Sequence, residues 1–206
     1  MDYTQYSQIE FRRKFWKIVG ASITMTNPAD ESVIGFIKMK AWKLREDITL
    51  FHDEAQTKPA ISIRARQIID FGATYDVTDS ATGQPIASLR RKGLRSTFVR
   101  DRWNMMDANG TEFGYIQETS SWLAIARRYL SAISDILGLI FAFIPETYTI
   151  VHTHPTGDQV IGSIVHRKNP FIVKMGLTFS DNETSADRRI AVAATALLAI
   201  VDATKN

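Results

Sequence analysis

The 206-residue chain contains no cysteine, which excludes disulfide bonds, thiolate metal sites and cysteine nucleophiles and fits a reducing cytosol. Its first ten residues, MDYTQYSQIE, are polar and lack the apolar core of a signal peptide, so we do not expect a cleaved secretion signal. Its longest apolar runs fall short of the roughly 20 residues that a membrane-spanning helix needs. A nucleophile elbow, a Walker loop and a dinucleotide-binding fingerprint are also absent. Nothing in the sequence therefore demands an enzyme, and we expect no cofactor.

The overall composition is that of a globular protein with a slight excess of positive charge. Hydrophobic residues make up 45% of the sequence, enough for a substantial core, and we expect a single domain over residues 1–206. The formal net charge is +3 and the sequence pI is ≈ 9.2. This balance permits an anionic partner, such as lipid headgroups or nucleic acid, but carries little weight alone.

The most apolar stretch lies near the C-terminus. Residues 190–201 carry no charge, and Thr195 is the single polar residue among them. Alanine, leucine and isoleucine favour a helix here, and Ser185 or Asp187 is suited to cap its start. Because a helix that is apolar on every face must be buried on every side, we predict a core helix over residues 186–203.

The preceding sequence repeats one pattern, in which two short alternating runs of apolar and polar residues flank a turn rich in Asp, Asn or Gly. This pattern is typical of antiparallel hairpins. With two further single strands it gives about twelve strands, and a sheet of that size curls or closes. The expected fold is therefore mainly β: a closed antiparallel β-barrel around the central hydrophobic C-terminal helix. The expected hairpins join 23–27 to 33–40, 48–53 to 60–66, 75–79 to 85–92, 103–107 to 113–118 and 148–152 to 160–167, with single strands around 11–19 and 171–179.

A segment at residues 120–145 interrupts this pattern. It has serine caps and a helical composition, and it ends at a proline, so we predict an inserted helix between two strands. From residue 129 to 144 only Asp135 is charged. This apolar part has three open roles: it covers one end of the barrel, docks on a protein partner or another subunit, or lies in a membrane interface.

Four stretches resemble the LURP-one-related proteins, which belong with phospholipid scramblases and Tubby C-terminal domains in a Tubby-like superfamily. The stretches are FRRKFWKIVG at 11–20, KAWKLREDITL at 40–50, YDVTDSATG at 75–83 and IASLRRK at 86–92. The resemblance implies a closed barrel around a hydrophobic C-terminal helix, together with attachment to or rearrangement of membrane lipids or phosphoinositide binding. The chain lacks the proline-rich arm, the cysteine-rich palmitoylation cluster and the acidic calcium loop of scramblases, so lipid anchoring and calcium control are not carried over.

Basic residues concentrate in two places. Between residues 90 and 102 there are six cations and one acid, and several arginines that converge on one spot suit phosphate recognition. The second place is the pair Arg127 and Arg128, which precedes the apolar part of the inserted segment, as in interfacial helices that bind headgroups. The alternative for both groups is an ordinary solvated surface. The candidate lipid- or anion-binding residues are Arg90, Arg91, Lys92, Arg95, Arg100, Arg102, Arg127 and Arg128.

Two other kinds of site receive weaker support. His152 and His154 have the spacing of strand residues on one face, and His166 on the next strand is a conceivable third metal ligand, but we interpret these as ordinary polar residues and expect no metal. Tryptophans and phenylalanines beside arginines suggest base stacking, although their alternation favours core packing.

The leading interpretation is a non-enzymatic, cytoplasmic barrel that interacts with anionic phospholipid or phosphoinositide and is held peripherally at the inner membrane face. The alternative is a soluble adaptor that docks on a protein partner, or on a second copy, through its inserted segment at 129–144. Nucleic-acid binding is a distant third. Scrambling is disfavoured because the apolar C-terminal helix is needed as the barrel core.

Overall fold

The computed structural model describes residues 3, 5–14, 22–39, 48–67, 73–92, 102–119, 145–167, 172–181 and 187–203. These residues form twelve strands and one helix. In chain order they are β1 Gln8–Lys14, β2 Ser22–Thr26, β3 Val33–Met39, β4 Ile48–Phe51, β5 Pro59–Gln67, β6 Thr74–Asp79, β7 Pro85–Arg91, β8 Arg102–Met106, β9 Glu112–Glu118, β10 Glu146–His154, β11 Gly157–Arg167, β12 Ile172–Phe179 and α3 Arg188–Ala203.

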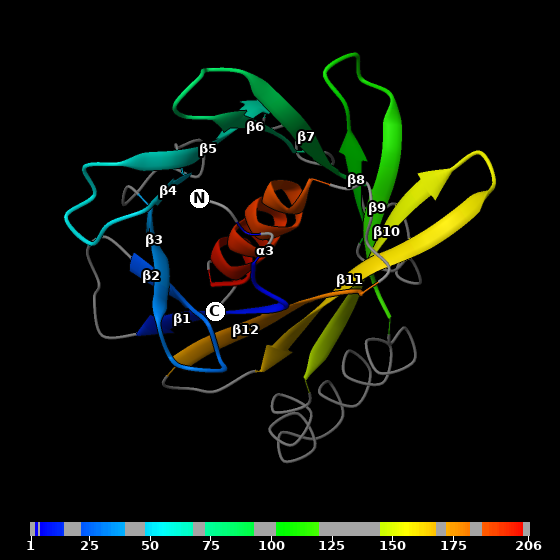
Figure 1. The fold of residues 1–206 in the computed structure, drawn as a ribbon. Coiled ribbons are helices and arrows are strands. Elements are labelled where there is room, and N and C mark those ends of the chain that lie inside the picture. Colours follow the sequence, from blue (N-terminus) through cyan, green and yellow to red (C-terminus); the bar gives the residue numbers. More distant parts are fainter. Residues whose placement is uncertain are drawn as a thin grey trace, which may run out of the picture.

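Each strand pairs antiparallel with its neighbours in the chain, and β12 returns to pair with β1, so the sheet closes into a barrel. Figure 1 looks along this barrel and shows α3 inside it. The predicted mainly β fold, with its closed barrel of about twelve strands around a C-terminal helix, is confirmed. The predicted helix at 120–145 lies outside the described residues, except for Pro145.

The hairpins follow the alternation of the sequence. Along β8, for example, Trp103 and Met105 are buried while their neighbours are half-buried. The turns have matching local chemistry: the side chain of Asp107 accepts hydrogen bonds from the backbone N–H groups of Asn109 and Thr111. Gly110 in this turn has φ 81°, a conformation that a residue with a Cβ rarely adopts. Within this hairpin, the alternation along the strand and the residues of the turn therefore both favour the observed structure.

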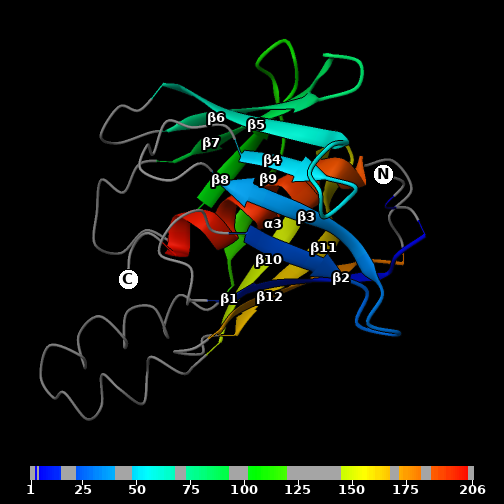
Figure 2. The same ribbon diagram turned by 90° about the vertical axis from the view of Figure 1, so that its left-hand side faces the viewer.

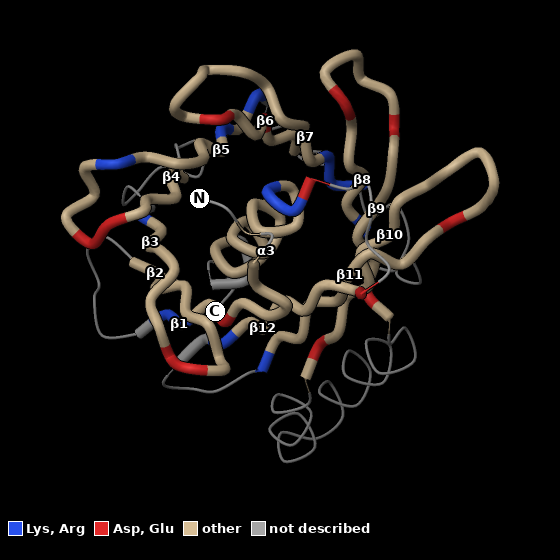
Figure 3. The backbone as a smooth tube through the Cα atoms, in the orientation of Figure 1, with Lys and Arg blue, Asp and Glu red and all other residues tan. Residues whose placement is uncertain are grey.

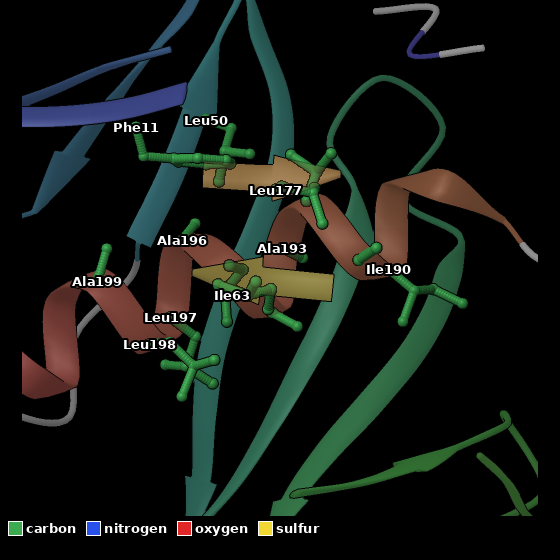
Figure 4. Close-up of a cluster of buried hydrophobic side chains, with 14 of the residues drawn as sticks. Phe11, Leu50, Ile63, Leu177, Ile190, Ala193, Ala196, Leu197, Leu198 and Ala199 are labelled. Carbon is green, nitrogen blue, oxygen red and sulfur yellow. The ribbon is translucent and has the colours of Figure 1, made fainter. Parts of the chain in front are cut away.

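The core consists of α3 and the inward side chains of all the strands around it. Leu197 is 1% exposed, and Ala193 and Ala196 are fully buried, so the small side chains let the strands approach closely on every side. Figure 4 shows Ala193, Ala196 and Leu197 lying among side chains from the barrel wall. The one polar side chain of this run, Thr195, is fully buried and donates its hydroxyl to the carbonyl of Ala191. Within the described residues, no helix has the length and hydropathy required to cross a membrane.

Two arginines anchor the start of α3. Arg188 donates to the carbonyl oxygens of Tyr3 and Tyr6, which ties the N-terminal segment to the helix. Arg189 forms ion pairs with Asp187 and with Asp79 at the end of β6, at 2.6 and 2.7 Å. These contacts fix the helix along the barrel axis, with its C-terminal end pointing away from the tight turns (Figure 2).

Candidate functional site at the basic end

The barrel has two chemically different ends. One, which we call the turn end, carries the tight turns and the start of α3, and it faces the viewer in Figure 3. At the opposite end β1, β3, β5, β7 and β11 finish while β8 and β12 begin, and all seven strands have Lys or Arg close to that end. We call this the basic end. The tight turns and the strand ends beside them carry Asp30, Glu31, Asp53, Glu54, Asp79, Asp107 and Asp158. Figure 3 colours Asp and Glu red.

Arg90 and Lys92 lie together on the outer face at the basic end. Successive residues of a strand point to opposite faces, so these two share the face opposite to the inward Leu89. Both are exposed. The backbone N–H of Lys92 donates to the carbonyl of Arg102 at 2.9 Å, which places Arg102 of β8 directly beside it.

Arg91 is separated from this group. It lies opposite the buried Trp103 in the β7–β8 register, and its guanidinium stands 5.7 Å from the centre of the indole ring. It is half-buried rather than exposed. The structure therefore assigns Arg91 to packing at the rim of the core, in contrast to its two neighbours in sequence.

Arg102 is on the outer face but is held by other side chains. Its Nη2 lies 2.7 Å from a carboxylate oxygen of Glu112, its Nε donates to Asn104, and its guanidinium stacks 3.9 Å from the ring centre of Tyr115. Much of its charge is thus compensated locally. Glu112 is ten positions away across the β8–β9 hairpin, so only the hairpin register reveals this partner.

The remaining candidates Arg95, Arg100, Arg127 and Arg128 lie outside the described residues, as does the segment 129–144. Sequence reasoning did not single out Arg64 and Arg66 of β5, which the structure also places at the basic end. The signal was present, since alternate strands of an up-and-down barrel all finish at the same end.

Polar side chains also lie inside the barrel at the basic end. His166 is 2% exposed, and its Nδ1 lies 3.6 Å from a carboxylate oxygen of Glu146, which also accepts from the hydroxyl of Tyr148 at 3.4 Å. Glu118 is buried beside Tyr148 in the strand register. Sequence analysis named His166 but missed the carboxylates beside it, although Glu118 occupies an inward position two residues after Ile116.

The histidines do not form one site. The rings of His152 and His154 are 4.2 Å apart and Phe113 packs against His152, but His166 pairs with Glu146 at the opposite end of β10. Burial, and to a lesser extent His154, hold the pKa of His152 below its ordinary value. In the described part of the chain, no group of three or more His, Cys, Asp or Glu residues is placed to hold a metal ion.

The arrangement at the basic end suits electrostatic attraction to an extended anionic surface. Arg90 and Lys92 are both exposed and lie two positions apart on the outer face of the barrel, where they add positive charge.

Comparison with known proteins gives one finding. A family model described as LURP-one-related matches residues 33–199, from β3 to the last turns of α3. No curated protein matches the chain, and no solved structure matches it.

Proposed function

The chain belongs to the LURP-one-related family, and from this premise we propose that it is a non-enzymatic cytoplasmic protein that binds anionic phospholipid surfaces peripherally. Family membership supports the Tubby-like barrel fold. The observation that carries the proposal is the exposed pair Arg90 and Lys92 at an end of the barrel where seven strands bring cations together. Each basic residue near an anionic bilayer contributes on the order of 1 kcal/mol, and this attraction weakens as salt rises.

The double substitution Arg90→Glu with Lys92→Glu tests this proposal. Loss of two contributions of about 1 kcal/mol each predicts binding to anionic vesicles at least roughly 30-fold weaker, measured by co-sedimentation at low salt. The thermal midpoint should hardly change, because charges on an exposed face contribute little to folding. Arg91 is left intact because it packs against Trp103.

A matched control compares two single variants, Lys92→Glu at the basic end and Lys58→Glu at the turn end. Lys58 is an exposed lysine at the turn end, so its reversal should reduce vesicle binding much less than that of Lys92. Equal losses from the two single variants would contradict an oriented basic end. Wild-type protein that ignores anionic vesicles even at low salt would refute the lipid proposal.

The alternative function is that of an adaptor that binds a protein partner through the segment between β9 and β10. The strands on either side of this segment pair directly, with Tyr148 opposite Glu118 and the N–H of Thr119 donating to the carbonyl of Thr147 at 2.8 Å. The hydrogen bonds between β9 and β10 therefore extend to the last described residue before the segment. We expect these bonds to hold the two strands together whatever the length of the segment that joins them.

Replacement of residues 120–144 by a short polar turn should therefore leave a folded barrel with nearly unchanged far-ultraviolet circular dichroism. Under the adaptor hypothesis the shortened protein loses partner binding but keeps its affinity for anionic vesicles. Under the lipid hypothesis as stated above, vesicle binding persists because Arg90 and Lys92 remain. An unfolded product would assign the segment to the core and contradict the interaction role.

A further inference from the structure

A pocket of ≈ 440 Å³ lies on the outer face of the barrel, over β5, β6 and β7. It exists because the β7–β8 ladder stops at Ser88 opposite Met106, whereas the β6–β7 ladder continues to Pro85 opposite Thr78. Beyond Ser88, back toward Pro85, β7 is not paired with β8. The β8–β9 turn at 107–110 lines the side of the pocket that faces this unpaired part of β7. The volume is within the range of roughly 300–1,000 Å³ that small-ligand sites occupy.

The charged side chains of this pocket differ in sign along the barrel axis, with the positive side toward the basic end and the negative side toward the turn end. Arg66 stands on the side of the basic end and donates to Asp76 from Nε at 2.9 Å and from Nη2 at 2.5 Å. Since a guanidinium has five N–H donors, others remain for a ligand. Arg90 continues the positive side, two residues beyond Ser88 on the same outer face.

The opposite side of the pocket is negative. Asp107 lines it at the turn end, and both hydrogen bonds within its turn go to the same carboxylate oxygen, Oδ1. Arg66 compensates the carboxylate of Asp76, whereas among the described residues that line the pocket no basic side chain is left to compensate Asp107. Between the two charged sides lie the hydroxyls of Thr78 and Ser88, which donate or accept.

We propose that this pocket binds a phosphoamine, that is, a phosphate and a primary ammonium joined by a short linker. The phosphate lies beside Arg66, and the ammonium lies beside Asp107. A multiply phosphorylated headgroup would place anions against Asp107, so the pocket disfavours it. This chemistry is that of a serine or ethanolamine phospholipid headgroup, an identification that rests on the proposed function. The phosphate then lies closer to the basic end than the ammonium does. This placement fits a bilayer at the basic end, because the phosphate of such a lipid lies closer to the hydrocarbon core than its amine.

Titration of ¹⁵N-labelled protein with O-phosphoethanolamine tests the pocket without a bilayer. We expect saturable shifts of the amides around Arg66 and at 107–110, and weaker ones with methyl phosphate or ethanolamine alone. Asp107→Asn keeps an oxygen for the turn but removes the charge, and the loss of one charge-assisted contact predicts about tenfold weaker binding. Asp53→Asn is the matched control, because Asp53 accepts equivalent backbone hydrogen bonds in the β4–β5 turn. Equal affinity for methyl phosphate and O-phosphoethanolamine, or equal effects of the two variants, would overturn the proposal.

Vesicles identify the source of the ligand. Phosphatidylserine and phosphatidylglycerol carry the same net charge, but only the former has an ammonium. A preference for phosphatidylserine that Asp107→Asn removes supports the lipid headgroup, whereas solution binding without that preference supports a free phosphoamine. If the protein neither binds the phosphoamine in solution nor prefers phosphatidylserine, the pocket proposal is wrong. If it nevertheless binds phosphatidylglycerol vesicles, the proposed function still holds.

Discussion

Leu197→Asp is expected to leave no cooperatively folded barrel. Leu197 is 1% exposed at the centre of α3, and the helix is enclosed by strands all round, so a carboxylate at this position has no path to water. Burial of an unpaired charge costs several kcal/mol, which is comparable to the roughly 5–15 kcal/mol of total stability of a domain. The expected product is insoluble or lacks a cooperative thermal transition.

Leu197→Met serves as the control, since a volume-conserving apolar exchange usually costs less than about 1.5 kcal/mol. This variant should melt cooperatively at a slightly lower temperature, as followed by circular dichroism. Truncation after Asp187 removes the whole helix and should give insoluble protein for the same reason. A soluble Leu197→Asp protein with a sharp transition would contradict a helix-filled barrel.

The fold was predictable because its main signals are local. Period-2 alternation and a turn with Asp107 and Gly110 define the β8–β9 hairpin, which was expected at 103–107 and 113–118 and observed at 102–106 and 112–118. The run of uncharged, almost entirely apolar residues identifies α3 in the same way, and the helix starts two residues later than expected. Closure followed from the number of strands and from the need to cover an apolar helix.

The candidate site was less predictable because it depends on register between strands. The sequence groups Arg90, Arg91 and Lys92 together, but alternation turns Arg91 toward Trp103, and the cross-strand partner Glu112 offsets the charge of Arg102. The outer pocket depends on where a ladder ends, which no single strand encodes. These properties arise from pairs of segments, so composition and spacing alone do not reveal them.

The same dependence on register makes two glycines indispensable and a third replaceable. Gly114 in β9 faces Met105 in the register, and a Cβ added to it would overlap the carbonyl oxygen of Val151 in β10. A Cβ at Gly162 in β11 would lie 2.7 Å from the carbonyl oxygen of Thr178. A Cβ at Gly176 in β12 would meet no atom within 4 Å.

Gly114→Ala is therefore expected to destabilise the barrel by about 3 kcal/mol or more, because the obstacle is backbone, and β10 must move to admit the methyl group. Gly162→Ala should destabilise less. Gly176→Ala should be neutral or stabilise by up to about 1 kcal/mol, since alanine has less unfolded-state freedom than glycine and finds open space here. Urea unfolding of the three variants measures this order. Comparable losses at Gly114 and Gly176 would show that the close approach of β10 to β9 does not limit the barrel, and that glycine is required for another reason.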